Sequence, residues 1–222
     1  MSVKNLPSTL SASYEDTIAV LRLSRPEKRN ALDDETVKGL RQFFMDLPDQ
    51  IRAVVLHGEG QHFSAGLDLG EVSGVHDLHK GVLHSQMWHR AFHEIQFGRV
   101  PVFSVLHGAV VGGGFELAAS THVRIAEQSA YYALPEGQRG IFLGGGGSVR
   151  ITRLIGLAMV QDLMLTGRTL SAQEGLVCGA SQYLVEDGTG FEKAMSLARK
   201  AASKSRVSTR LSALNRQAIS GA

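Results

Sequence analysis

The stretch His107-Gly-Ala-Val-Val-Gly-Gly-Gly-Phe-Glu-Leu117 decides how the fold is interpreted. An apolar run with strand composition, residues 102–106, comes before it, and the glycines 112–114 lead into residues 116–119, which we expect to form the first turn of a helix. Glycine allows positive φ and close approach to a ligand. A helix start carries unpaired N–H groups and a partial positive charge. The junction therefore suits a developing negative charge, although a plain strand-to-helix turn would use the same glycines.

A second carboxylate follows this junction. Glu136, in the segment Leu134-Pro135-Glu136, stands downstream of Glu116, and another glycine cluster, 144–147, comes after it. Two carboxylates bracketed by bare backbone amides indicate acid/base chemistry on a carbonyl compound rather than phosphate transfer. If the two lie close together they cannot easily both ionise, so one pKa should rise and their titrations should couple. The alternative is an ordinary helix glutamate and a solvated loop glutamate.

Composition narrows the class of protein. The chain has 222 residues, 43% of them hydrophobic, which is enough for one large domain or one domain with an appendage. A formal net charge of +2 implies no strong nucleic-acid field. The single cysteine, Cys178, rules out an internal disulfide and fits a reducing compartment. We find no apolar leader and no apolar run of membrane-spanning length, so we expect a cytoplasmic protein without membrane partners.

Hydrophobic periodicity places the other elements. We expect a strand within 13–23, a helix capped by Asp33 or Asp34 and ending before Pro48, a short buried strand at 53–56 and a turn-rich loop from 57 to 74. Further on we expect a helix at 76–97, strands at 123–126 and 130–133, helical structure from 148 to 166 broken at Gly156, a capping box at 171–174, a strand at 177–184 and a basic helix at 188–219. This pattern is α/β.

Five motifs, in this order, resemble the crotonase (enoyl-CoA hydratase/isomerase) superfamily and cover most of the chain from about residue 13 to 185. They are Arg25-Pro26-Glu27-Lys28-Arg29-Asn30-Ala31-Leu32, Phe63-Ser64-Ala65-Gly66-Leu67-Asp68-Leu69, Gly112-Gly113-Gly114-Phe115-Glu116-Leu117, Leu134-Pro135-Glu136 and Leu165-Thr166-Gly167-Arg168. The resemblance implies a spiral core of ββα turns with the active site (residues 1–187) and a C-terminal helical segment (188–222), abbreviated here. It also implies a homotrimer or homohexamer.

The resemblance also assigns roles. Two backbone N–H groups, those of Leu67 and Gly113, would form an oxyanion hole for a thioester carbonyl. Glu116 and Glu136 would both hold the water that adds to C3, and Glu136 would deliver the proton to C2. Ala65, Leu67 and Leu69 match the loop whose backbone binds the adenine of coenzyme A. Lys28 or Arg29 could contact its phosphates, or Lys28 could simply be solvated. Gly144 falls where a backbone amide helps to orient the water. The hydratase pattern there ends in Pro-Gly-x-Gly-Gly, whereas this chain has Leu143 in place of the proline.

Other templates are weaker. His89 and His93 have an i, i+4 spacing that can bind zinc, but there is no His-Glu-x-x-His motif, so we expect no metal. Met87, Trp88 and Phe92 could line an acyl pocket or simply pack in the core. The chain contains no Walker loop, no Gly-x-Ser-x-Gly elbow and no Rossmann fingerprint.

The resemblance therefore predicts an acyl-CoA lyase, foremost an enoyl-CoA hydratase that adds water across a trans-2-enoyl-CoA. It would use no cofactor beyond the CoA of its substrate. Two alternatives stay open. One is another reaction of the superfamily, namely double-bond isomerisation or hydration and cleavage of an aromatic acyl-CoA. The other is a non-catalytic binding protein of the same fold that contacts RNA through the basic residues of 199–216.

Overall fold

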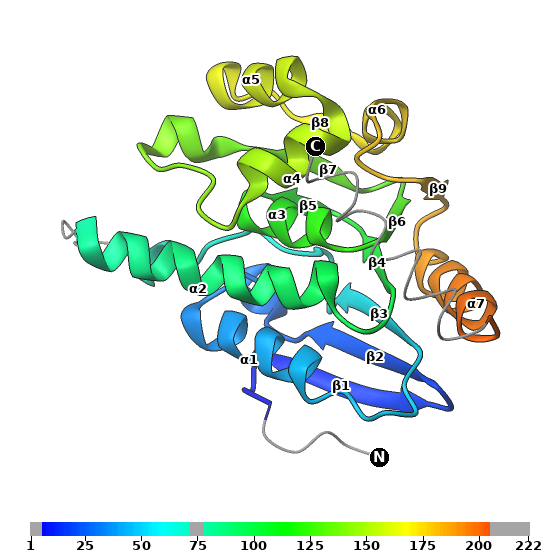
Figure 1. The fold of residues 1–222 in the computed structure, drawn as a ribbon. Helices are drawn as coiled ribbons and strands as arrows, with labels where there is room; N and C mark the ends of the chain where they lie inside the picture. Colours follow the sequence, from blue (N-terminus) through cyan, green and yellow to red (C-terminus); the bar gives the residue numbers. More distant parts are fainter. Residues whose placement is uncertain (1–5, 72–77, 205–222) are drawn as a thin grey trace, which may run out of the picture.

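The computed structural model describes residues 6–71 and 78–204. Its larger sheet has the strand order β1-β2-β3-β4-β6-β9 (Figure 1). These strands are β1 (Leu10–Glu15), β2 (Ile18–Leu23), β3 (Ala53–Gly58), β4 (Val102–Leu106), β6 (Val123–Glu127) and β9 (Tyr183–Val185). The β1–β2 pair is antiparallel, and the other neighbours are parallel. A second sheet, in the order β5-β7-β8, consists of β5 (Ala109–Val111), β7 (Tyr131–Ala133) and β8 (Leu170–Ser171).

Helices connect the parallel strands and cover both faces of the larger sheet. The α-helices are α1 (Asp34–Met45), α2 (Leu78–Phe97), α3 (Gly113–Ser120), α4 (Gly147–Ile155), α5 (Leu157–Thr166), α6 (Ala172–Cys178) and α7 (Gly190–Ala202). The short 3₁₀ helices of the described residues are η1 (Pro26–Lys28), η2 (Leu69–Glu71) and η3 (Pro135–Arg139). In Figure 1, α1 and α2 lie side by side on one face, and α7 packs on the other.

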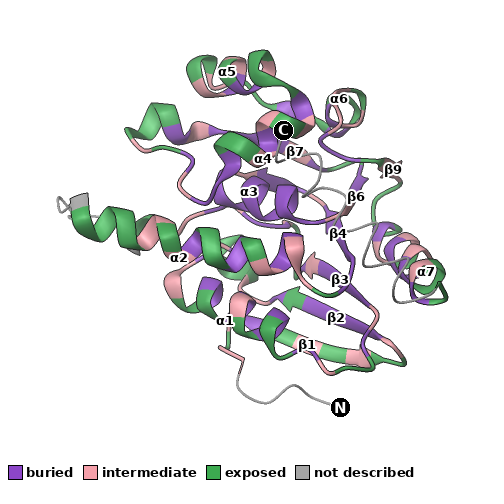
Figure 2. Cartoon of the chain, viewed as in Figure 1, coloured by how far each residue is buried: buried purple, intermediate pink, exposed green. Residues whose placement is uncertain are grey.

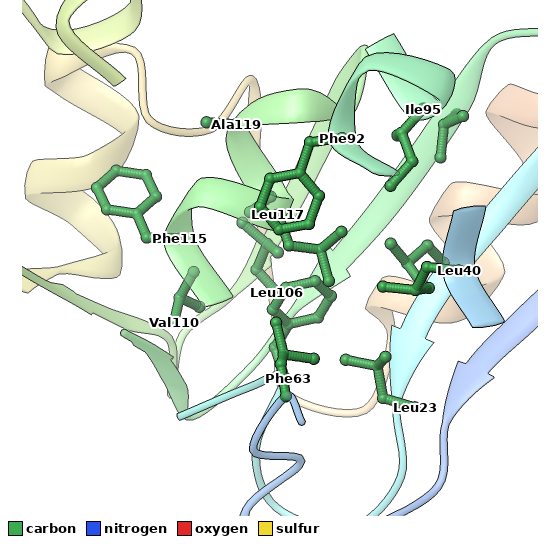
Figure 3. Packing of buried hydrophobic residues seen from close by; sticks show 14 of the residues in the cluster. Leu23, Leu40, Phe63, Phe92, Ile95, Leu106, Val110, Phe115, Leu117 and Ala119 are labelled. Atoms are coloured by element: carbon green, nitrogen blue, oxygen red, sulfur yellow. The ribbon is translucent and has the colours of Figure 1, made fainter. Parts of the chain in front are cut away.

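Successive side chains along each strand point to opposite faces of the sheet, so each face has its own core. In β2, Leu21 and Leu23 point into the larger core with Leu40 of α1, whereas Ile18 and Val20 point to a smaller core under α7. Figure 3 shows residues of the larger core converging from the strands and from helices α1, α2 and α3. α3 is buried along its whole length (Figure 2). Any carboxylate on α3 is therefore removed from bulk water.

Several expected elements are confirmed. Asp33 caps α1, accepting a hydrogen bond from the Thr36 backbone. Gly156 separates α4 from α5, and Ser171 and Glu174 form the expected capping box at the start of α6. Strands β3, β4, β6 and β7 begin where the apolar runs placed them, within one residue. The sequence was sufficient to predict these elements because each cap, helix break or apolar run involves only a few neighbouring residues.

Three expectations were wrong. The single strand at 13–23 is a hairpin, because Asp16 takes a positive φ of 52° and turns the chain between β1 and β2. The strand expected at 177–184 is confined to β9, since α6 continues to Cys178 and ends at Gly179, which takes a positive φ of 91°. The helix after the glycine triplet begins at Gly113 rather than at Glu116, so two of the glycines form its first turn.

The ends of two expected elements lie partly outside the described residues. These are residues 76–77 of the expected helix 76–97 and residues 205–219 of the basic helix; the described part of the latter is α7. No helix within residues 6–71 and 78–204 combines the length and apolarity needed to cross a membrane.

Candidate active site

The backbone nitrogens of Leu67 and Gly113 approach each other across the start of α3. A Cβ added to Gly113 would lie 3.3 Å from the Leu67 nitrogen, and one added to Gly66 would lie 2.9 Å from the Gly113 nitrogen. Gly113 is the first residue of α3, so its N–H is among those without a partner inside the helix. Glycines are required here because side chains would fill the space between the two amides. The structure thus brings the two predicted donors together.

A short parallel bridge orients the Leu67 amide. The Leu32 N–H donates to the Gly66 carbonyl (2.7 Å), and the Asp68 N–H donates to the Leu32 carbonyl (2.9 Å), so Leu67 is the bridge partner of Leu32. In a parallel bridge, the residues on either side of the central one make the hydrogen bonds. The Leu67 N–H therefore points away from Leu32 and toward α3.

Buried polar side chains fix this loop. Asn30, which is 1% exposed and has a positive φ of 54°, donates through its side chain to the carbonyls of Glu59 (2.9 Å) and His62 (2.7 Å). The Ser64 hydroxyl donates to the Asn30 carbonyl at 2.8 Å. Arg25 forms an ion pair with Asp68 at 2.8 Å. The Ser64 hydrogen bond and the Arg25–Asp68 ion pair tie the first motif to the second, and the Asn30 side chain ties the first motif to the segment just before the second. Together these contacts restrict the position of the Leu67 amide.

Glu116 lies four residues beyond the N-cap of α3, and its carboxylate is buried. Its Oε1 accepts hydrogen bonds from the backbone N–H of Gly145 (3.0 Å) and of Gly147 (2.7 Å). Gly147 opens α4, so the carboxylate also occupies the positive end of that helix. Burial, the largest cause, and the charge of Glu136 raise the pKa of Glu116, while the two N–H donors and the charge of Arg150 oppose the increase; the resulting pKa is about 7. Such a group can exchange a proton near neutral pH.

Glu136 is also buried, at 5% exposure, although it stands in the short helix η3. Its Oε1 lies 2.6 Å from where a Cβ of Gly112 would stand, next to the amide of Gly113. Its Oε2 has no hydrogen-bond partner among the described residues. Burial raises the pKa of Glu136. An ordinary helix glutamate and a solvated loop glutamate do not fit this burial, so the two carboxylates form one electrostatically coupled pair beside the amides.

The family model described as enoyl-CoA hydratase/isomerase matches residues 13–219. The chain belongs to this family. A short-chain-enoyl-CoA hydratase of Clostridium acetobutylicum is 31% identical over 207 residues, covering 91% of this chain and 79% of that protein.

Solved structures extend the family assignment. A Rhodopseudomonas palustris protein provisionally named an enoyl-CoA hydratase has 52% identity and a TM-score of 0.93, covering 97% of this chain and 83% of that one. The enoyl-CoA hydratase of Bacillus anthracis has 30% identity and a TM-score of 0.87, covering 96% and 82% of the two chains. The α/β fold described above is therefore the crotonase fold.

The residues that the family resemblance assigned to coenzyme A lie on one surface strip. Lys28 is exposed at the end of η1, and Leu69 is exposed at the start of η2. Ala65 is half-buried, and its N–H donates to the Arg29 carbonyl at 2.9 Å. This bond and the Leu32–Leu67 bridge hold the two loops together, so the strip leads to the Leu67 amide.

The glycine cluster after Glu136 holds two residues that the sequence did not identify. Gly145 and Gly147 donate to Glu116, whereas Gly144 uses its carbonyl, which accepts from the Ser85 hydroxyl at 2.6 Å. A Cβ on Gly147 would lie 2.6 Å from Glu116 Cγ, so only glycine leaves room for the carboxylate. The run of glycines was visible in the sequence, but which amides face Glu116 depends on the path of the loop.

The histidines of α2 have other partners. His84 Nε2 lies 3.0 Å from Asp34 Oδ1, and the His93 ring contacts the Phe97 ring at a tilted angle with centroids 4.8 Å apart. Burial and the charge of Arg150 both lower the pKa of His89. Over residues 6–71 and 78–204, no three His, Cys, Asp or Glu side chains gather as a metal site. Trp88 and Phe92 are both buried; Trp88 packs on Gly113, and Phe92 contacts it edge-on at 5.6 Å.

Proposed function

We propose that the protein is an enoyl-CoA hydratase that adds water across the double bond of a trans-2-enoyl-CoA thioester. The observation that carries the proposal is the meeting of two buried carboxylates, Glu116 and Glu136, with the convergent amides of Leu67 and Gly113. Membership of the family and the names of its hydratases in Clostridium acetobutylicum and Bacillus anthracis support it.

The amide pair would bind the thioester oxygen. As water attacks C3, the π electrons move toward that oxygen, and the N–H groups of Leu67 and Gly113 stabilise the enolate charge. The loss of one such donor typically slows a reaction by about 10²–10³-fold. Burial by Trp88 strengthens these hydrogen bonds because it excludes water from the Gly113 side.

The glutamates would divide the proton transfers. The two N–H donors on Glu116 favour its ionised form, so Glu116 is the base that takes a proton from the attacking water. The unpartnered Oε2 of Glu136 suits a protonated carboxyl that delivers a proton to C2. One O–H bond of water and the C2–C3 π bond break, and one C–O bond and one C–H bond form. The pair holds one proton before and after the addition, and exchange with solvent returns that proton from Glu116 to Glu136. The proposed addition draws on no group beyond these residues, water and substrate.

Coenzyme A would lie along the strip of Lys28, Ala65 and Leu69. An exposed lysine offers a charge to the phosphates, and the backbone of 65–69 offers donors and acceptors to the adenine. Gly144 would contribute its amide to the water site, next to the amides that hold Glu116. We also propose that the protein assembles as a homotrimer or as a pair of trimers. Light scattering of the purified protein would measure this oligomeric state.

The test is hydration of crotonyl-CoA, followed by the loss of conjugated-enoyl absorbance. Wild-type protein should be active, and Glu116→Gln and Glu136→Gln should each lose at least about 10²-fold in kcat, since each removes one proton-transfer group. Glu192→Gln, an exposed position on α7, is the matched control and should match wild type. If both active-site variants keep wild-type rates, the assignment is wrong. Mass spectrometry of products from short, long and aromatic acyl-CoAs separates hydration from isomerisation or cleavage.

A further inference from the structure

The loop that holds Glu116 contains four consecutive glycines and lacks a proline, so its own backbone does not stiffen it. It is nevertheless anchored at its start, because Leu143 is buried in the larger core. Two side chains from outside the loop bind its next two carbonyls. The Ser85 hydroxyl of α2 donates to Gly144 at 2.6 Å, and Arg150 Nη1 of α4 donates to Gly145 at 2.7 Å.

These two contacts act on consecutive peptides of the loop. The Gly144 carbonyl and the Gly145 N–H belong to one peptide unit, so Ser85, this unit and Glu116 Oε1 form a continuous chain of hydrogen bonds. A carbonyl that accepts a hydrogen bond polarises its own peptide and strengthens the N–H as a donor. The Gly145 carbonyl, held by Arg150, belongs to the next peptide, which joins Gly145 to Gly146 and so lies between the two donating amides.

Arg150 is itself fixed. Its Nε donates to Gln96 Oε1 at 2.6 Å, and Gln96 is 7% exposed on α2. The guanidinium therefore bridges α2 and α4 across the glycine loop. The rigid fork of arginine can hold both acceptors at once, which lysine cannot do.

We propose that Arg150 and Ser85 are positioning residues for Glu116, holding the glycine loop so that the amides of Gly145 and Gly147 stay on the catalytic carboxylate. Neither residue touches the reacting atoms in this account, and both act through the loop. The inference rests on the proposed role of Glu116 as the base.

Electrostatics adds a second, separable effect of Arg150. Its positive charge lowers the pKa of Glu116, whereas Glu136, on η3, raises it. Arg150 also acts on His89 of α2, whose pKa is lowered by burial and by the Arg150 charge. Removal of the Arg150 charge should therefore raise the pKa of Glu116, while Arg150→Lys should retain most of the charge and lose the fork.

The experiment compares Arg150→Met, Arg150→Lys and Ser85→Ala with Arg153→Met, an exposed arginine on the same helix. A displacement of about 1 Å at a reacting group can cost 10²-fold in rate, so we expect Arg150→Met to lose about 10²-fold in kcat with KM within a few-fold of wild type. The midpoint at which kcat of Arg150→Met rises with pH should also lie at a higher pH than in the wild type. Arg150→Lys should restore the pH profile but only part of kcat, and Ser85→Ala should lose roughly 10-fold in kcat.

A measurement made without substrate tests the positioning role separately from the proposed hydratase activity. The Glu116 carboxyl, followed by ¹³C NMR and assigned with Glu116→Gln, should titrate at higher pH in Arg150→Met and unchanged in Arg153→Met. An inactive wild type would contradict the hydratase proposal alone. Wild-type values of kcat, pH profile and Glu116 titration in folded Arg150→Met would overturn the positioning role, and Ser85→Ala together with Arg150→Lys decides it if Arg150→Met does not fold.

Discussion

Glu116→Gln should stabilise the folded protein at alkaline pH while it removes activity. Burial raises the pKa of Glu116 from its ordinary value of 4.5 to about 7, so between these values the folded state retains a proton that the unfolded chain has lost. Stability therefore falls as pH rises through this window, because ionising the buried carboxyl costs free energy in the folded state alone. Glutamine cannot ionise, and its side-chain oxygen can still accept from Gly145 and Gly147.

The size of the effect follows from the two pKa values. One pKa unit is worth about 1.4 kcal/mol, so the shift from 4.5 to about 7 corresponds to roughly 3 kcal/mol by pH 8. For a domain of this length, 1 kcal/mol moves Tm by about 2–4 °C. Relative to wild type, Glu116→Gln should gain roughly 6–12 °C near pH 8 and little near pH 4.5.

Thermal unfolding followed by circular dichroism from pH 4.5 to 8.5 measures this difference. Glu192→Gln, at the exposed site on α7, is the control and should follow the wild-type curve. The curves of wild type and Glu116→Gln should separate as pH rises and run parallel above the folded-state pKa. Curves that stay parallel over the whole range would show that the pKa of Glu116 is not raised in the folded state, and the reasoning about burial would fail.

Three further predictions use other parts of the molecule. Gly113→Ala would place a methyl group 2.6 Å from Trp88 Cζ3, so we expect about 10²–10³-fold lower kcat/KM with crotonyl-CoA, whereas Gly81→Ala, with nothing within 4 Å, should keep wild-type activity. Asn30→Ala leaves two carbonyls without their donor and should lower the free energy of unfolding by roughly 3 kcal/mol in urea titrations; a loss below 1 kcal/mol would contradict the loop account. Ser171→Ala breaks the capping box and should cost about 1 kcal/mol in the same titration with activity unchanged, and an unaltered midpoint would argue against the cap.

Much of the fold was accessible from the sequence because its signals are local. Asp33 and Ser171 cap helices through contacts with residues three positions away, and Gly156 breaks a helix where its φ is positive. The hairpin at Asp16 was missed because an aspartate at positive φ gives a weaker signal than a glycine. The end of α6 was misplaced because the apolar residues near Val177 suggested a strand, although Val177 is exposed on the helix.

The site was predictable in its residue types but not in its contacts. The two glutamates and the two amides were named from motifs, and their burial and mutual approach depend on α3 being covered on every side. Gly145 and Gly147 as donors to Glu116, and Arg150 and Ser85 behind them, depend on how a loop folds between α2 and α4. Nothing in their sequence spacing encodes those contacts.

The most direct test of the account is a crystal structure of the protein with bound acetoacetyl-CoA. We expect the thioester oxygen to lie about 2.7–3.1 Å from the nitrogens of both Leu67 and Gly113, with the carboxylates of Glu116 and Glu136 on the side of C2 and C3. A thioester oxygen bound elsewhere, or glutamates facing separate regions, would contradict the central claim.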